Sequence, residues 1–115
     1  MEIHCFTVNP FSENSYLIWS ESKKAIVIDP GFYTQAEQYA FKEFILENGL
    51  QLEKVVLTHA HIDHIFGLEF IFKEFGLQPW MNLYEKPVYL SGGQISQMYG
   101  MNVFNYPEPA GWIDE

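Results

Sequence analysis

Three of the chain's four histidines lie within six positions of one another, with an aspartate among them: His59, His61, Asp63 and His64. The residues just before them, Lys54 to Thr58, are mainly β-branched and aliphatic and predict a buried strand. The residues just after them, Ile65 to Phe75, predict a strongly apolar helix that needs cover on more than one side. The polar cluster therefore falls on a turn from a strand to a helix, which indicates an α/β fold.

The spacing lets these side chains converge. His59 and His61 are two apart and share one side of an extended segment, while His61 and His64 are three apart and share one side once the chain turns helical. Neutral imidazole and carboxylate are ligands that zinc-like and iron-like cations accept. Asp63 is also placed to cap free N–H groups where the helix begins. Histidines without a metal are the alternative, but no packing or capping rule requires this set, so we favour a metal site.

The stretch from Thr58 to Gly67 resembles the Thr-His-x-His-x-Asp-His-x-x-Gly motif of the metallo-β-lactamase-fold hydrolases, especially their glyoxalase II-like (hydroxyacylglutathione hydrolase-like) members. Two upstream segments also resemble the family, Asn14 to Leu17 and Ala25 to Gly31. The resemblance covers nearly the whole chain and is specific for the fold but weakly specific for the substrate. It implies the N-terminal half of an αβ/βα sandwich, with a mixed sheet and helices on one face.

The resemblance also implies a two-metal site. Its ligands in this chain would be His59 and His61 for the first metal and Asp63 and His64 for the second. Zinc is the expected metal, with iron or manganese as alternatives. Asp29 would support the site through hydrogen bonds, and its alternative role is that of a simple turn former. Gly67 would allow close packing of the helix, or be incidental.

In such a site two metals lower the pKa of a shared water, and the resulting hydroxide attacks an acyl carbon, with Asp63 orienting the nucleophile. The implied protein is a hydrolase of a small thioester-like acyl substrate. A lactonase or a nuclease on the same fold is the second hypothesis. A non-catalytic metal-binding or interaction fragment is the third, and it belongs to a different class.

The remaining ligands of the implied site have no match in this chain. No histidine follows His64, and the spare His4 lies on the opening strand, with no family role matched to it. Asp114 is the only aspartate after Asp63. We therefore expect an N-terminal fragment that holds half of the ligand cage, binds zinc weakly and is inactive alone.

The expected organisation is one incomplete domain over residues 1–115, with a metal-binding half over 1–76 and a connector with short helices over 77–115. The face meant for the missing C-terminal half is expected to be apolar and exposed, so the chain is expected to self-associate, for example as a homodimer.

Composition argues against several other classes of protein. A net charge of −9 argues against a nucleic-acid partner. The single cysteine, Cys5, excludes an internal disulfide and suits a reducing compartment. Neither a signal peptide nor an apolar run of roughly 18 residues is visible, so a cytoplasmic protein without a membrane span is expected.

Patterns elsewhere predict the remaining elements. Strands are expected over residues 2–8, 15–20, 25–28 and 79–81, and short helices over 83–90 and 94–99, broken by Ser91 to Gly93. A helix from Thr34 to Asn48, capped by Thr34 with Glu37, would join two strands by a parallel crossover. Its expected apolar face is Ala36, Tyr39, Ala40, Phe44 and Ile45. The tail from Met101 shows no periodicity, and no structure is expected there.

Overall fold

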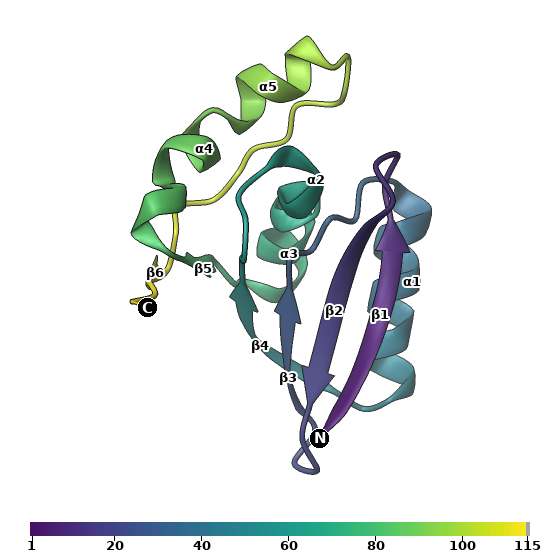
Figure 1. Ribbon diagram of the computed structural model, residues 1–115. Coiled ribbons are helices and arrows are strands. Elements are labelled where there is room, and N and C mark those ends of the chain that lie inside the picture. Colours follow the sequence, from purple (N-terminus) through teal and green to yellow (C-terminus); the bar gives the residue numbers. More distant parts are fainter. Residues whose placement is uncertain (115) are drawn as a thin grey trace.

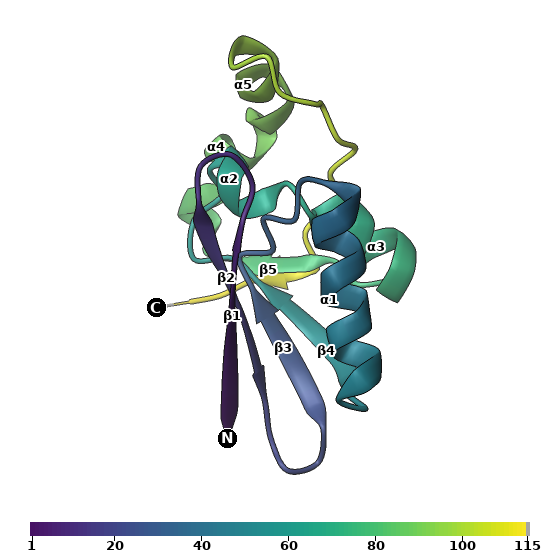
Figure 2. The ribbon, with the colours of Figure 1, turned by 90° about the vertical axis from the view of Figure 1, so that its right-hand side faces the viewer.

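The computed structural model describes residues 1–114, which form a single mixed sheet with helices packed on one face (Figures 1 and 2). The strands follow one another across the sheet in chain order: β1 (Glu2–Val8), β2 (Glu13–Trp19), β3 (Lys24–Ile28), β4 (Gln51–Val56), β5 (Pro79–Met81) and β6 (Gly111–Trp112). The first three strands pair antiparallel, and β3 through β6 pair parallel. The predicted α/β class is confirmed.

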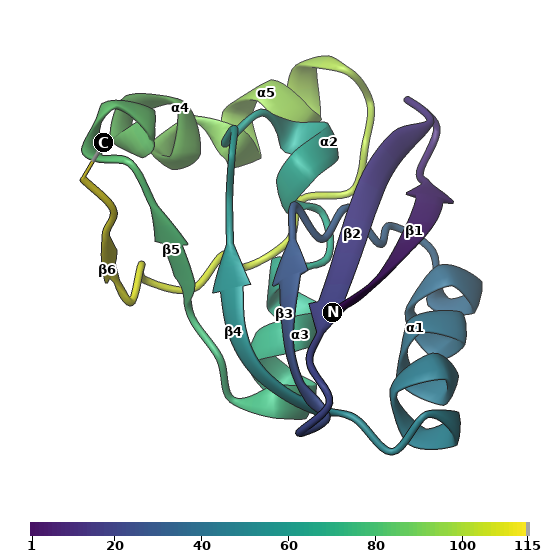
Figure 3. The same ribbon diagram turned by 60° about the horizontal axis from the view of Figure 1, so that its bottom comes forward.

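The helices fill the connections between the parallel strands. They are α1 (Gln35–Glu47), α2 (Ile62–Ile65), α3 (Leu68–Phe75), the 3₁₀ turn η1 (Leu83–Glu85), α4 (Lys86–Leu90) and α5 (Gly92–Met98). Helices α1 and α3 lie on the same side of the sheet (Figure 2). Helices α2, α4 and α5 gather at the end where β3 and β4 finish (Figure 3). No helix within residues 1–114 is long and apolar enough to cross a membrane.

Helix α1 begins as predicted and packs differently from the prediction. Thr34 is the N-cap, and a complete capping box with Glu37 is present. The buried residues are Phe41 and Ile45, whereas Ala36, Tyr39 and Ala40 of the expected face are exposed. The large Phe41 ring sets the packing stripe, and the Tyr39 hydroxyl instead donates to Glu43 on the solvent side.

The strand before the histidines ends earlier than predicted. Strand β4 finishes at Val56 because the N–H of Thr58 donates to the Asp29 side chain, 2.7 Å away, instead of to a neighbouring strand. The predicted continuous helix from Ile65 to Phe75 is also wrong, since it is interrupted between α2 and α3. At the break, the N–H of Gly67 donates to the Pro30 carbonyl oxygen at 2.8 Å.

Two predictions near the C-terminus need correction. Gly92 and Gly93 do not separate two helices but open α5, with Ser91 as its N-cap. The tail also contains a short strand, β6, where no structure was expected. This strand pairs Gly111 with Trp80 of β5, and a side chain at position 111 would overlap the Trp80 ring. The contact is possible because glycine has no side chain. Hydrophobic periodicity does not predict a contact of this kind.

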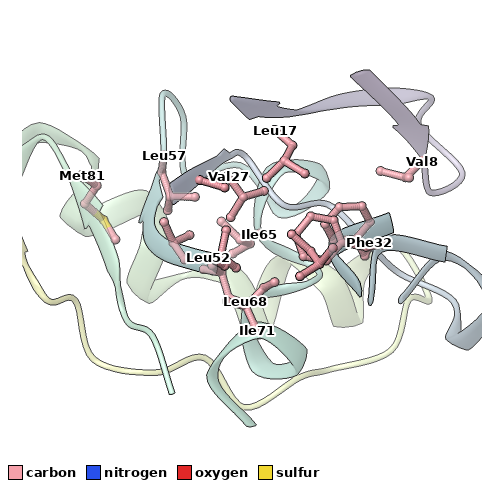
Figure 4. Packing of buried hydrophobic residues seen from close by; sticks show 14 of the residues in the cluster. Val8, Leu17, Val27, Phe32, Leu52, Leu57, Ile65, Leu68, Ile71 and Met81 are labelled. Atoms are coloured by element: carbon pink, nitrogen blue, oxygen red, sulfur yellow. The ribbon is translucent and has the colours of Figure 1, made fainter. Parts of the chain in front are cut away.

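The core lies between the sheet and the helices α1 and α3 (Figure 4). Leu17, Val27 and Val55 are fully buried and lie side by side on neighbouring strands. The opposite side of the sheet carries the alternate residues of the same strands. We call it the open face and define it by Ile3, Tyr16, Ile18, Ile26, Val56 and Trp80. Ile3 is 64% exposed, so no described element covers this end of the face.

Candidate metal centre

The three clustered imidazoles converge at the carboxyl end of β4. Their ring centroids are 5.4 Å apart for His59 and His64, 5.9 Å for His59 and His61, and 6.4 Å for His61 and His64. Strands β3 and β4 are parallel, so both end at this edge of the sheet (Figure 3). The loop after β4 and the start of α2 together supply these side chains.

The predicted side chains form a cluster that opens to solvent. His59 and His61 are exposed, while Asp63 and His64 are half-buried. The Nε2 atom of His64 lies 3.5 Å from the Asp63 carboxylate. All four predicted ligands therefore occupy one accessible region, as a strand-to-helix turn requires.

Asp29 contacts this cluster from its buried side, through His64. It is buried at the end of β3, with a left-handed φ of 53°, which aspartate tolerates better than most residues. Its carboxylate accepts hydrogen bonds from the backbone N–H and the hydroxyl of Thr58. It also lies 3.1 Å from Nδ1 of His64. Residues 57–61 join β4 to α2, and we call them the histidine loop. Asp29 is thus both a turn residue and a hydrogen-bonding partner of this loop.

The neighbouring carboxylate changes the titration of His64. Asp29 raises the pKa of the His64 imidazole above its ordinary value of 6.5, and partial burial opposes this shift. Asp29 therefore stabilises the protonated ring when no metal is present. A metal that binds Nε2 competes with that proton.

Glu13 is a buried acidic residue that sequence reasoning missed. The residue is 6% exposed, and Oε1 lies 3.5 Å from Nδ1 of His64. Burial raises the pKa of the Glu13 carboxyl to about 8. The signal was available, because strand alternation places Glu13 and Ser15 on the same face as the core residue Leu17.

Hydrogen-bond counting also indicates a protonated Glu13. The Ser15 hydroxyl has one hydrogen but two acceptors near it, the Asp29 carbonyl at 2.7 Å and the Glu13 carboxyl at 3.0 Å. It also accepts a hydrogen bond from the N–H of Gly31. A carbonyl oxygen cannot donate, so both contacts are satisfied together only when Glu13 carries the second proton.

Among the described residues, one group of three side chains has ligand atoms close enough together to hold a cation. Glu13, Asp29 and His64 each offer a ligand atom, and these atoms lie within 4.8 Å of one another. Glu13 Oε1 is buried without a hydrogen-bond partner among the described residues. The predicted ligands His59 and His61 lie outside this group, and Asp63 faces the other ring nitrogen of His64, Nε2.

The donor chemistry nevertheless favours the predicted ligands over the buried group. A protonated glutamic acid is a poor ligand, and metal-bound histidines usually direct their second ring nitrogen at a carboxylate. Asp29 beside Nδ1 gives His64 that arrangement and leaves Nε2 to face Asp63. Imidazole and carboxylate around open solvent fit a catalytic zinc site.

Two further residues missed in the sequence hold the histidine loop. The Asn9 side-chain amide donates to the carbonyl oxygens of Gly31 and Asp63 at 2.9 and 2.8 Å. On the other flank, the Glu85 carboxylate accepts from the N–H of Ala60 at 2.8 Å. These contacts join segments that are far apart in the chain, so no local sequence pattern predicts them.

The expected capping role of Asp63 is wrong. Helix α2 has His61 as its N-cap residue and no side-chain cap hydrogen bond. Asp63 lies inside the first turn, past the position from which a side chain can cap. Its carboxylate remains free to face His64.

This fold and cluster define an α/β protein with a candidate metal site at the ends of its strands. Residues 8–111 match the family model described as the metallo-beta-lactamase superfamily. The chain belongs to this superfamily.

Curated relatives agree with the family. The chain is 30% identical over 116 residues to hydroxyacylglutathione hydrolase GloC of Haemophilus influenzae, covering 100% of this chain and 53% of that protein. It is 33% identical over 118 residues to a hydroxyacylglutathione hydrolase of Francisella tularensis subsp. novicida, covering 96% and 43%. The chain thus spans about half the length of the curated relatives it matches, or less.

Solved structures show the same fold. The TTHA1623 protein in a di-iron-bound form gives a TM-score of 0.83 at 24% identity, over 97% of this chain and 54% of that one. The BLEG-1 B3 metallo-beta-lactamase gives 0.78 at 20% identity, over 98% and 53%. The predicted fold, a part of the metallo-β-lactamase sandwich, is confirmed.

Proposed function

We propose that this chain supplies part of the active site of a metal-dependent hydrolase of thioester-like acyl substrates. Its metal ligands would be His59, His61, Asp63 and His64. The observation that carries the proposal is the convergence of three imidazoles, 5.4–6.4 Å apart, beside a buried carboxylate. The relatives named hydroxyacylglutathione hydrolase support the acyl substrate class.

The proposed roles follow from the side-chain contacts. Asp29 orients the His64 ring from the buried side and fixes Thr58 at the start of the loop. Asp63 faces the solvent-side nitrogen of His64 and would help to position the attacking water. Two bound zinc ions would supply a hydroxide at neutral pH and stabilise the developing oxyanion.

We further propose that the rest of the ligand cage lies on a second half of the same fold, packed against the open face. Residues 1–115 would then be a single incomplete domain. This chain would offer only two protein ligands to each metal, whereas a catalytic zinc normally has three. It would therefore bind zinc weakly and be inactive alone.

Calorimetric titration of the metal-free chain with zinc chloride tests the site. We expect weak binding that His61→Ala reduces further, since it removes one imidazole of the cluster. His4→Ala is the matched control, because His4 stacks on Phe44 outside the cluster, and it should leave zinc binding unchanged. Absence of binding would overturn the metal site. Nanomolar affinity would overturn the half-cage proposal.

Hydrolysis of acyl thioesters, with a lactoyl and a hexanoyl thioester as the two substrates, tests the reaction class. We expect no turnover by this chain with zinc and measurable turnover by a longer chain that adds two histidines and a bridging aspartate. If the longer chain binds zinc but hydrolyses no acyl substrate, the second candidate gains support.

That second candidate is a non-catalytic metal-binding or interaction module. The observation in its favour is that the described residues bring together only four predicted ligands, two of them widely exposed. A lactonase activity fits the same geometry, while the net charge of −9 weighs against a nuclease. The mixed imidazole and carboxylate donors also suit iron or manganese, and metal analysis of the purified protein distinguishes these ions from zinc.

A further inference from the structure

A cavity of about 350 Å³ adjoins the candidate ligands. His61 and Asp63 form one wall, and the opposite wall comes from α4, α5 and the turn between β1 and β2. The lining residues are Phe11, Ala60, His61, Ile62, Asp63, Val88, Ser91, Ile95 and Tyr99. Helices α2 and α5 lie close together at this end of the molecule (Figure 3). A molecule held here has one end beside the proposed metal ligands.

The walls away from the ligands are apolar. The Phe11 and Tyr99 rings meet edge to face, with centroids 5.9 Å apart, and Val88 and Ile95 line the inner part. Apart from His61 and Asp63, the lining residues offer only the hydroxyls of Ser91 and Tyr99 as hydrogen-bonding side chains. The volume falls within the range typical of small-ligand sites.

The described residues that line the cavity include no lysine or arginine that could receive an anion. The chain has six lysines and no arginine, and none of them lines the cavity. Three of the lysines are engaged elsewhere: Lys42 with Glu74, Lys73 with Glu69, and Lys54 over the Trp80 ring. In the metal-free chain the carboxylate of Asp63 lies in the wall, so a carboxylate-bearing group would meet like charge there.

We propose that this cavity binds an uncharged, apolar acyl chain, placing its carbonyl beside His61 and Asp63 and its alkyl end between Val88 and Ile95. The inference rests on the proposed hydrolase function and specifies its substrate class. It separates this protein from an enzyme that selects a hydroxylated acyl group or recognises an anionic thiol in the same cavity.

Burial of alkyl surface gives the expected selectivity. Each added methylene should tighten binding by about fourfold, from roughly 0.8 kcal/mol of transfer free energy, until the cavity is full. Lactamide lacks the alkyl chain that reaches Val88 and Ile95, so it should bind more weakly than hexanamide.

Binding to the full metal-free chain is measured by chemical-shift titration of its backbone amides. The probes are butanamide, hexanamide, lactamide and glutathione, which cannot turn over. We expect hexanamide to bind more tightly than butanamide and to shift signals at Ala60, Ile62 and Ile95. Lactamide should bind more weakly, and glutathione should leave these signals unchanged.

Substitutions that fill the cavity test its location. Val88→Trp should weaken hexanamide binding at least tenfold. Leu90→Trp is the matched control on the same helix, because Leu90 is 72% exposed and does not line the cavity, and it should have no effect. If Val88→Trp does not fold, Ile95→Trp with the control Met98→Trp answers the same question on α5.

Three results would overturn the proposal: glutathione or lactamide binding as tightly as hexanamide, hexanamide affinity unchanged by the filling variants, or shifts confined to the open face. Failure of the hydrolase proposal looks different. Zinc titration would then fail while hexanamide still binds in the cavity.

Discussion

At the residue scale, the shifted pKa values of Glu13 and His64 make the stability of the metal-free protein depend on pH. The folded state holds the pKa of Glu13 near 8, against an ordinary 4.5. Between these values the folded protein retains a proton that the unfolded chain releases, so stability falls as pH rises. The raised pKa of His64 acts in the same direction, because its stabilising charge is complete below pH 6.5 and is lost as pH passes the folded pKa.

We therefore predict that the metal-free chain is more stable at pH 5 than at pH 8. The slope contributed by Glu13 is at most about 1.4 kcal/mol per pH unit. Urea denaturation at a series of pH values measures it. Glu13→Gln keeps the shape and cannot ionise, so it should flatten the profile. Equal profiles for the two proteins would show that Glu13 titrates normally.

Gly67 gives a second prediction at this scale. A Cβ there would lie 2.7 Å from the Pro30 carbonyl oxygen and 3.0 Å from the Phe32 nitrogen, both backbone atoms that cannot move alone. Gly67→Ala should lower the free energy of unfolding by about 1–3 kcal/mol. Gly93→Ala is the control, because Gly93 lies inside α5 with an ordinary contact of 3.5 Å, and it should be neutral or stabilising.

Much of the candidate site could be predicted from the sequence, since the spacing of His59, His61 and His64 limits how they can be placed. The hydrogen-bonding position of Asp29 was one of two open alternatives. Glu13 and Asn9 were missed because a buried acid and a long-range amide contact depend on which strands become neighbours. That information lies in the tertiary structure.

At the element scale, α1 depends on its first turn. Glu37 accepts hydrogen bonds from the backbone N–H groups of Tyr33, Thr34 and Asn9, so it joins the helix to the turn after β1. Thr34 caps the same turn through its side chain. One acidic residue therefore satisfies three backbone groups from two segments.

We predict that Thr34→Ala costs about 1 kcal/mol of stability, as for a typical N-cap, and that Glu37→Ala costs more because three donors lose their partner. Thermal unfolding by circular dichroism measures both. Glu47→Ala near the other end of α1 is the comparison and should cost less than either. A Glu37→Ala variant as stable as Glu47→Ala would contradict the prediction.

Element prediction succeeded where one local rule decides the outcome. Strand β5 and the start of α1 were predicted to the residue, because proline, threonine and glutamate mark these boundaries. It failed where packing decides. The break between α2 and α3 comes from contact with Pro30, and β6 exists because Gly111 makes room for Trp80.

At the scale of the whole molecule, the open face is an apolar surface that the described helices leave exposed. Ile3, Ile18 and Ile26 adjoin across β1, β2 and β3, with no described helix over them. A contiguous apolar surface of this kind usually marks an interface.

We predict that the isolated chain self-associates through this face at high concentration, as light scattering would show. Ile26→Glu should shift the population toward monomer, because the carboxylate lies opposite Lys54 and adds charge to the face. Leu46→Glu is the control on α1, where Leu46 is 66% exposed away from the sheet, and it should leave the mass unchanged. A wild-type monomer at millimolar concentration would contradict the prediction.

The order of the strands has a consequence for biosynthesis. Each strand from β2 to β6 pairs with the one made just before it, so each of these strands has one partner that is already synthesised. The sheet can grow one strand at a time as the nascent polypeptide emerges. Its uncovered side would then be available to chaperones throughout translation.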